Sequence, residues 1–336
     1  MPTGSEPLII ERVVADSDLD GLIAASILKR AHPNAEVRFS HAAQVRSGSM
    51  DAYIDRTTAL CDLPFHPACG VHFDHHRTNR AKGEERATFI AAGGIDAWAD
   101  APSAARVVYD WYATSLDLQD LAPHMPIIDA LDGGGIRLQD FLDDGPLVCF
   151  ARCLGSGSMN LLHLALDHLA SGGVIEGLWE IPEVRAAMDH ARSDRGEMEE
   201  LIRERSSITD RLAVVRLDGQ ARRPSGYLVT AVLGAECDAC CIIHGYIDGS
   251  IDDPDRPALG ASFYANSFHA HQHDGFDLST LATSLDVTGG GHANACGCRI
   301  QPVDGRGFIE DRTLESSDVE RNLAHWFHLW SQRSHR

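Results

Sequence analysis

The sequence predicts an α/β protein with a parallel sheet in its N-terminal domain and a second, β-rich domain after it. Apolar runs at residues 8–15, 59–61 and 70–73 are each followed by an aspartate and alternate with segments of helical spacing. After residue 211 the sequence changes to short β-type runs separated by Gly, Pro and Asp. At 336 residues the chain is long enough for both domains.

The N-terminal elements follow one another as strand, acidic turn and helix. The β-leaning run at residues 8–15 breaks into Asp-Ser-Asp-Leu-Asp-Gly, and residues 22–30 then have the apolar spacing and basic end of a helix. Ser103 is a plausible cap for the helical pattern that follows it, and residues 121–131 predict a further helix. Because ligands gather outside the carboxyl ends of parallel strands, the site is expected there.

The second half of the chain predicts a helical connector and then a β-rich domain. An apolar helix is expected around residues 161–169 and a charged one from about 183 to 210. These patterns give an N-terminal domain at 1–195, a helical linker at 196–211 and a C-terminal domain at 212–336. The β-type runs of that domain are residues 212–217, 226–233, 241–247 and 259–264.

The charge balance excludes some classes of function. Twenty-nine Lys and Arg against 49 Asp and Glu give a formal charge of -20, which disfavours a binder of long nucleic acid. Clustered carboxylates instead suit divalent cations. The N-terminus has no basic opening or apolar core of a signal peptide, and no run of 18 apolar residues occurs, so a cytoplasmic protein without membrane contact is expected.

Asp16, Asp18 and Asp20 alternate directly after the first predicted strand. If the chain stays extended, the three carboxylates share one face and repel one another unless a cation joins them. The alternative is an acidic helix N-terminus, where aspartate is favoured in any case.

Two further strand ends carry polar residues. Asp62 follows one of them, and by itself it is more often a turn or cap residue than a ligand. Asp74-His75-His76 follows the next, where one histidine can ligate a metal while its neighbour faces the substrate. Together the carboxylates and imidazole suit two metal ions about 3.5–4 Å apart. This ligand set favours Mn²⁺, then Mg²⁺ or Co²⁺, over structural zinc.

The second domain contains Gly289-Gly290-Gly291-His292. Three glycines allow close approach of the backbone to a ligand and can direct amide groups at an anion, while His292 adds a donor or a positive charge. This pattern predicts a phosphate-binding loop. A glycine-rich turn with an incidental histidine is the alternative.

In their order along the chain, these motifs resemble those of the DHH phosphoesterases. The acidic turn at residues 16–21, Asp62 and Asp74-His75-His76 are similar to the first three family motifs, and Asp132 before three glycines is similar to the fourth. Residues 289–292 resemble the glycine-histidine motif of the DHH-associated C-terminal domain. The resemblance covers about residues 8 to 300. It implies a doubly wound parallel sheet in a catalytic, metal-binding domain at 1–195, a second, smaller α/β domain at 212–336 that binds the substrate, and the active site in the cleft between them.

The resemblance implies two Mn²⁺ ions in the N-terminal domain, for which Mg²⁺ or Co²⁺ could substitute. It implies metal ligation by Asp18, Asp20, Asp62, His75 and Asp132, with Asp62 bridging, and His76 at an oxygen of the substrate. Asp16 corresponds to an acidic residue of RecJ-like members. Members with a histidine in the first motif have it where this chain has Val14. Asp129 competes with Asp132 for the fourth motif.

Among family activities, the size and charge of the chain favour hydrolysis of short oligonucleotides, linear dinucleotides or 3′-phosphoadenosine 5′-phosphate. Gly289, Gly290, Gly291 and His292 would hold a second phosphate. Members of the short-oligonucleotide type usually carry an Arg-Ser pair, whereas Ser262 has no adjacent arginine, so Tyr264 could stack on a base instead. The alternatives are a polyphosphate hydrolase and an inactive nucleotide-sensing module. Besides this nucleotide substrate, a second copy of the chain is expected as a partner in a homodimer.

Three remaining features have mainly structural interpretations. The nine cysteines are odd in number and are expected to be reduced, although Cys237, Cys240, Cys296 and Cys298 could form a zinc site. The histidines at 269, 271 and 273 are expected to lie in a polar loop. Trp326 and Trp330 are expected to pack in the core of the second domain.

Overall fold

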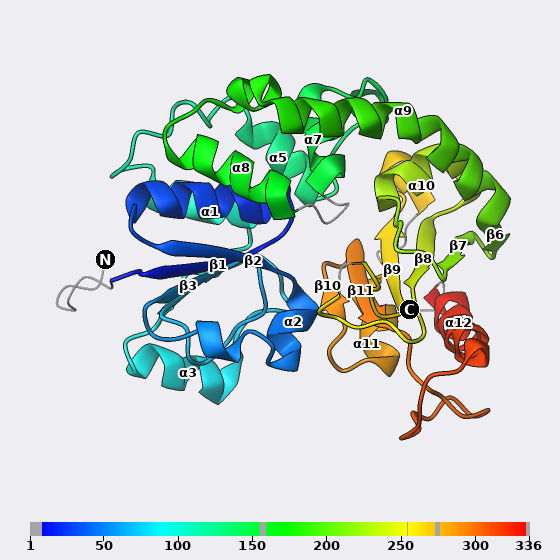
Figure 1. The fold of residues 1–336 in the computed structure, drawn as a ribbon. Coiled ribbons are helices and arrows are strands. Elements are labelled where there is room, and N and C mark those ends of the chain that lie inside the picture. Colours follow the sequence, from blue (N-terminus) through cyan, green and yellow to red (C-terminus); the bar gives the residue numbers. More distant parts are fainter. Residues whose placement is uncertain (1–8, 155–158, 254, 273–275, 334–336) are drawn as a thin grey trace. The chain divides into compact units, whose positions relative to one another are not determined.

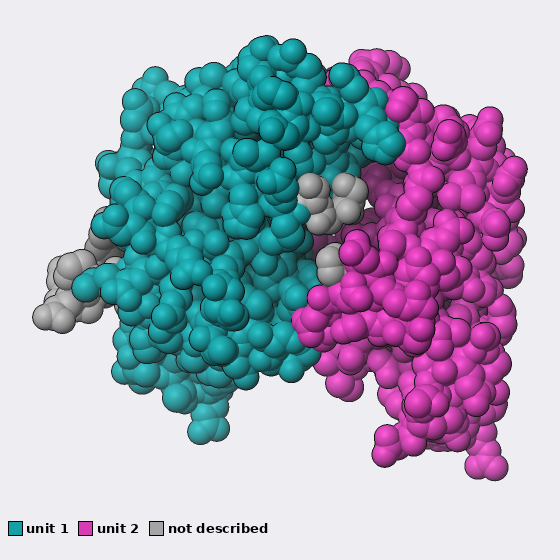
Figure 2. Space-filling model, in the orientation of Figure 1, with its two compact units in different colours: residues 1–135, 144–191 teal, residues 136–143, 192–336 magenta. Residues whose placement is uncertain are grey.

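The computed structural model describes residues 9–154, 159–253, 255–272 and 276–333. The chain forms two compact units, shown in teal and magenta in Figure 2. Unit 1 comprises residues 1–135 and 144–191, and the smaller unit 2 comprises residues 136–143 and 192–336.

Unit 1 is built on a five-stranded sheet in which all neighbouring strands are parallel (Figure 1). The strand order is β2-β1-β3-β4-β5, so the chain reverses direction of winding beside β1, as in doubly wound folds. The strands are β1 (Arg12–Asp16), β2 (Glu36–Ser40), β3 (Thr58–Cys61), β4 (Val71–Phe73) and β5 (Ile95–Asp96).

Helices cover both faces of this sheet (Figure 1). Those on one face bury the larger core: α1 (Leu19–Ala31), α4 (Ala104–Tyr112), α5 (Met125–Asp132), α7 (Pro146–Leu154) and α8 (Met159–Ala170). Helices α2 (Ala42–Ser47) and α3 (Gly83–Ala91) cover the other face around Leu60 and Phe89. Short 3-10 turns lie at η1 (Asp51–Tyr53) and η2 (Ile175–Glu180). Ser103 caps α4 as expected, because its hydroxyl accepts the Arg106 N–H at 3.0 Å.

Unit 2 contains a six-stranded mixed sheet in the order β10-β11-β9-β8-β7-β6. Only β7 and β8 pair in parallel among the described strands of this sheet. The strands are β6 (Ser206–Thr209), β7 (Leu212–Asp218), β8 (Ala239–Gly245), β9 (Gly260–Ala265), β10 (Gly290–Gly291) and β11 (Ala295–Arg299). The prediction of a parallel α/β domain followed by a smaller α/β domain is confirmed.

One face of the unit 2 sheet packs against α11 (Ser279–Leu285) and α12 (Ser316–Ser331). Trp326 and Trp330 of α12 are fully buried there, as expected. Helix α10 (Gly226–Leu233) contacts β8 and β9 outside this core. The remaining elements of unit 2 are α6 (Leu138–Leu142), η3 (Gly234–Glu236) and η4 (Ser267–Gln272).

Two expectations about the second half of the chain differ from the structure. The strand expected at 226–233 is wrong: this Val- and Thr-containing segment is helix α10, which Ser225 caps by accepting the Leu228 N–H. The charged helix α9 (Pro182–Arg205) ends before residue 210, because strand β6 begins at Ser206 and pairs with β7. The units divide within α9, at residue 191, and residues 136–143 group with unit 2. None of the helices in the described ranges is long and apolar enough to cross a membrane.

Candidate active site

The aspartates of the first motif lie where β1 turns into α1. Asp16 ends the strand, Asp18 is the N-cap of α1, and Asp20 lies in the first helical turn. Asp18 accepts the Gly21 N–H at 2.9 Å. The chain therefore does not stay extended, and the alternative of an acidic helix N-terminus describes the local backbone correctly. The three carboxylates accept hydrogen bonds from different parts of the chain, so the expectation that they share one face is not met.

Gly21 is required by the packing of this turn. A Cβ atom at this position would lie 2.2 Å from the carbonyl oxygen of Asp16. Only glycine lets α1 start this close to the end of β1, so the last residue of the motif holds the preceding aspartates in place.

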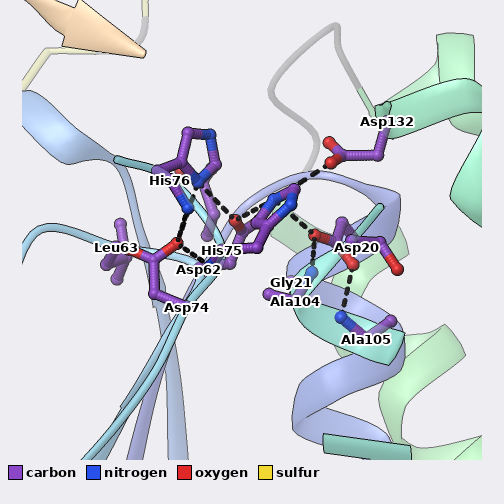
Figure 3. A network of polar contacts seen from close by, with 12 residues as sticks. Asp20, Gly21, Asp62, Leu63, Asp74, His75, His76, Ala104, Ala105 and Asp132 are labelled. Carbon is purple, nitrogen blue, oxygen red and sulfur yellow. Dashed lines mark hydrogen bonds and ion pairs between the residues drawn. The ribbon is translucent and has the colours of Figure 1, made fainter. Parts of the chain in front are cut away.

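Asp20 links α1 to the start of α4. Its two carboxylate oxygens accept the N–H groups of Ala104 at 2.7 Å and Ala105 at 2.6 Å (Figure 3). Unsatisfied amides at a helix N-terminus favour a negative charge. One of these oxygens lies 3.6 Å from Nε2 of His75. Asp20 is buried, and burial followed by the charge of Asp132 raises its pKa well above the ordinary value.

Asp62 follows β3 in a left-handed conformation, with φ of +59°. Aspartate tolerates this region better than most residues, and such backbone outliers gather at functional sites. The Asp62 N–H donates to the carbonyl of Phe73 at 2.9 Å, which fixes the residue against the end of β4. Its buried Oδ1 accepts no hydrogen bond from the described residues and lies 3.7 Å from His75 Nε2 and 3.4 Å from His76 Nδ1.

Asp74 organises the two histidines that follow it. Its Oδ1 accepts the backbone N–H groups of His75 at 2.7 Å and His76 at 2.9 Å, and lies 2.9 Å from His76 Nδ1 (Figure 3). Burial would raise the pKa of Asp74, but the neighbouring imidazoles of His76 and His72 hold it well below its usual range. The carboxylate therefore stays ionised and orients the ring of His76 through Nδ1.

His75 directs its Nε2 atom at the carboxylates. Nδ1 of this ring lies 3.0 Å from the carbonyl oxygen of Ala101, a contact that places the proton on Nδ1 in the neutral ring. Nε2 lies 3.1 Å from Oδ2 of Asp132. Burial would lower the pKa of His75, but the nearby carboxylate of Asp132 and the other surrounding carboxylates raise it to about 9. An imidazole that donates one N–H to a backbone carbonyl and offers the other nitrogen to acidic neighbours is typical of a metal ligand.

Of the two candidates for the fourth motif, only Asp132 lies in this cluster. Asp129, one turn earlier in α5, accepts the Ser103 hydroxyl at 2.7 Å and Nη2 of Arg106 at 2.6 Å. Both of its oxygens are thus used to join α5 to α4. The structure places Asp129 in a supporting contact and Asp132 beside His75 (Figure 3).

These residues form two overlapping groups with the composition of a metal site. Asp20, His75 and Asp132 form one group, and Asp62, Asp74, His75 and His76 form the other. Burial and the charges of Asp20 and Asp18 raise the pKa of Asp62 well above its ordinary value, so the metal-free carboxylates oppose one another. The buried Oδ1 of Asp62, together with this oxygen and imidazole donor set, fits a divalent cation such as Mn²⁺ or Mg²⁺. Asp16 and Asp18 lie outside both groups, and Val14 is buried in β1.

In unit 2, the glycine-histidine motif forms the edge of the sheet. Gly290 and Gly291 are strand β10 and pair with Gly297 and Cys296 of β11. A Cβ at Gly291, whose φ is +136°, would lie 2.5 Å from the Ala295 carbonyl oxygen, and a Cβ at Gly289 would lie 2.5 Å from that of Ala282. His292 begins the turn to β11, and its N–H donates to the Ala295 carbonyl. The glycines are therefore needed for close packing of the chain itself.

No family model and no curated protein matches the sequence. Among solved structures, the chain is similar to PggH, a pGpG-specific phosphodiesterase from Vibrio cholerae, with a TM-score of 0.61 and 20% identity over 95% of this chain and 99% of that one. The DHH domain of a protein described as a member of a family of ribosomal proteins is similar with a TM-score of 0.53 and 13% identity, over 94% of this chain and 86% of that one. The chain has the fold of the DHH family.

The RecJ protein of Thermus thermophilus, in complex with Mn²⁺, shares this fold in part. It matches with a TM-score of 0.51 and 13% identity, over 94% of this chain and 52% of RecJ. The DHH fold thus accounts for the strand ends at which the aspartates and histidines gather, and for a second unit with its own sheet.

Within this DHH fold, the structure brings an arginine to Ser262 that the sequence did not reveal. Nη1 of Arg223, in the segment before α10, donates to the Ser262 hydroxyl at 3.3 Å, and Nε2 of His244 lies 3.1 Å from the same oxygen. Arg223 is 39 residues distant in sequence, so no local motif could indicate the pair. Tyr264 is half-buried, and its ring packs against Gly226, where a Cβ would lie 2.0 Å from it.

None of the candidate metal groups among the described residues contains a cysteine. All nine cysteines are free thiols, and the alternative of a zinc site at Cys237, Cys240, Cys296 and Cys298 finds no support. Burial raises the pKa values of Cys237 and Cys240, which favours the protonated thiol. Of the histidine run, His269 is half-buried in η4, only the backbone of His271 is described, in the same element, and His273 lies outside the described residues.

Proposed function

We propose that the protein is a metal-dependent phosphodiesterase that hydrolyses short linear oligonucleotides, with linear dinucleotides as preferred substrates. The observation that carries the proposal is the buried cluster of Asp20, Asp62, His75 and Asp132, in which Oδ1 of Asp62 accepts no hydrogen bond from the described residues. The similarity to PggH supports the substrate class, because it extends over 95% of this chain and 99% of that phosphodiesterase.

The donor set suits a pair of Mn²⁺ or Mg²⁺ ions, which would supply a Lewis acid at the phosphoryl group and a hydroxide at neutral pH. Asp20, Asp62, His75 and Asp132 would hold the metal. Asp18 lies close enough for its charge to interact with Asp132, and its role as a ligand is part of the proposal. Asp62 is the best candidate for a bridging ligand, because it is near both histidines.

His76 is the residue best placed to serve the leaving group. Asp74 fixes the ring through Nδ1, and the imidazole would donate a proton or a hydrogen bond to an oxygen of the substrate. In the proposed reaction, water attacks phosphorus, the bond from phosphorus to the 3′ oxygen breaks, and that oxygen leaves as a protonated hydroxyl. One 5′-phosphorylated dinucleotide such as pGpG and one water then give two nucleoside monophosphates.

Unit 2 would bind the rest of the substrate. Gly289, Gly290, Gly291 and His292 remain candidates for a phosphate contact, and the exposed side of Tyr264 for a contact to a base. The location of the active site in a cleft between the domains stays a prediction.

The proposal is tested with protein stripped of metal and then supplied with Mn²⁺ or Mg²⁺. The substrates are pGpG, a short RNA, 3′-phosphoadenosine 5′-phosphate and polyphosphate. We expect release of nucleoside monophosphate from pGpG, and a loss of at least about 100-fold in Asp62→Asn, since even residues that only support metal ligands contribute 10–100-fold. Asp117→Asn, the same change at an exposed position, should retain full activity.

Two outcomes would contradict the proposal. Activity on polyphosphate alone would support the hydrolytic site but would contradict the proposed oligonucleotide substrate. Binding of pGpG without turnover under any metal would instead indicate a nucleotide-sensing module.

A further inference from the structure

Arg223 stands out among the arginines of this acidic protein. Many of the others form ion pairs with Asp or Glu, including the adjacent Arg222, which pairs with Asp194. Arg223 is exposed, and within the described residues its side chain makes one hydrogen bond, to the hydroxyl of Ser262. A guanidinium has five N–H donors in a rigid fork, so most of its donors remain available to an acceptor outside the chain.

The contact with Ser262 gives this guanidinium a defined direction. Burial and the nearby charge of Arg223 lower the pKa of His244 to about 3, so its ring is neutral at physiological pH. The Ser262 hydroxyl can therefore donate to Nε2 of His244 while its oxygen accepts from Arg223. Ser262 is only 4% exposed and cannot turn away freely. The contacts among His244, Ser262 and Arg223 thus hold one nitrogen of the guanidinium in place, and its other N–H donors remain available.

The position paired with Ser262 on the neighbouring strand carries no side chain. Ala261 and Phe263 belong to the core under the sheet, so Ser262 lies on the opposite face, with Gly297 as its register partner on β11. A Cβ at Gly297 would have only the Ala261 carbonyl oxygen and the Ser262 hydroxyl within 4 Å. Arg299, on the same strand, is already bound by Asp286 and Thr288. Arg223 is therefore the guanidinium available here.

The distance to the glycine-histidine motif suits a nucleotide. Ser262 pairs with Gly297, which pairs with Gly290, so Gly290 and Ser262 are two strands apart. At about 4.8 Å per strand this is roughly 10 Å. A phosphate near Gly290 and a base at Arg223 could thus belong to one nucleotide.

We propose that Arg223 reads the nucleobase of the substrate, with its guanidinium on the O6 and N7 acceptors of guanine and its direction set by Ser262 and His244. The proposal rests on the proposed function and adds base specificity to it. Arginine and guanine form two parallel hydrogen bonds, an arrangement that discriminates against adenine because its 6-amino group is a donor.

The test measures binding of pGpG and pApA by calorimetry in the Asp62→Asn background without metal, so that hydrolysis does not interfere. We expect tighter binding of pGpG, and a roughly 10- to 100-fold loss of pGpG affinity in Arg223→Gln that reduces the preference for guanine toward unity. Arg223→Lys keeps the charge but not the fork and should lose the preference as well. Arg222→Gln makes the same charge change one residue away and should leave the preference intact.

The possible results separate this inference from the proposed function. Equal weakening of pGpG and pApA in Arg223→Gln would show a phosphate contact and overturn base reading. No effect of Arg223→Gln, or no binding of pGpG by the unsubstituted Arg223 protein, would overturn it too. A protein that prefers pGpG through Arg223 but, with Asp62 intact, hydrolyses no dinucleotide would keep this inference and refute the phosphodiesterase. Melting temperatures of all variants verify that they are folded.

Discussion

Asp62 combines two features that cost stability in the metal-free protein. Its backbone has a left-handed conformation, and its carboxylate is buried among other acidic groups. A carboxyl group whose pKa is raised in the folded state stabilises the protein fully only below the unfolded pKa, and this contribution is lost as pH rises through the folded pKa. At neutral pH the metal-free protein therefore carries an electrostatic penalty at Asp62.

Asp62→Asn should raise the melting temperature of the metal-free protein at pH 7 and abolish its response to Mn²⁺. Asparagine also tolerates the left-handed region, so the substitution removes the charge with little backbone strain. Each unit of raised pKa corresponds to about 1.4 kcal/mol. At an Mn²⁺ concentration of about 100 times its Kd, the wild type should gain about 2.7 kcal/mol. Thermal unfolding with and without Mn²⁺ measures both effects, and a variant that still responds to Mn²⁺ would refute the role of Asp62.

At the scale of elements, helix α5 places two similar aspartates in different surroundings. Asp129 and Asp132 are separated by less than one helical turn, yet one is held by Ser103 and Arg106 of the α4 segment and the other faces His75. The same α4 N-terminus donates two amides to Asp20. Helix α4 thus connects the first and fourth motifs, and its packing decides which aspartate of α5 enters the site.

Asparagine substitutions at these two positions should have opposite signatures. Asp132→Asn should weaken Mn²⁺ binding by at least about tenfold, because it removes a charge beside His75. Asp129→Asn should lower stability by about 1–3 kcal/mol, because Arg106 loses its charged partner, while Mn²⁺ affinity changes much less. Calorimetric Mn²⁺ titration and urea unfolding separate the two effects. The reverse pattern would make Asp129 the fourth-motif ligand.

At the scale of the whole molecule, the acidity of the chain has its strongest effect at the strand ends of unit 1. There the carboxylates hold a proton on His75, whose pKa is raised to about 9. The pKa of Asp18 is raised to about 6 by desolvation of its carboxyl group and the charge of Asp132, although the residue as a whole is exposed. Metal ligands must be deprotonated, so these protons compete with the cation.

Mn²⁺ binding should therefore release at least about one proton at pH 7.5, and the apparent affinity should increase with pH up to about 9. The sign follows from His75, which is protonated below its raised pKa and ligates only in the neutral form. Below pH 6 the affinity should fall more steeply, because Asp18 is protonated as well. Calorimetry in two buffers of different ionisation enthalpy counts the protons, and an affinity that does not change between pH 6.5 and 9 would contradict the assignment of His75.

Local sequence patterns were sufficient to predict the strands and helix caps whose formation depends on residues close by in the sequence. Apolar runs followed by Asp16, Asp62 and Asp74 are strands with polar ends, because burial on both faces of a parallel sheet requires such runs. Ser103 could be recognised as a cap from its position before an apolar periodic segment. The strand expected at 226–233 failed because the propensities of Val and Thr are weak compared with packing on a sheet.

Only the tertiary structure decided which of these residues meet. Asp129 and Asp132 lie three residues apart in α5, and Arg106 on another helix holds only the first of them. Arg223 and His244 come to Ser262 from separate segments, and Asp74 is seen to orient His76 only once the side chains are in place. The sequence by itself determined the strand ends at which chemistry could gather. The packing of distant segments selected the side chains that gather there, because contacts between them depend on helix and strand placement and leave no local pattern.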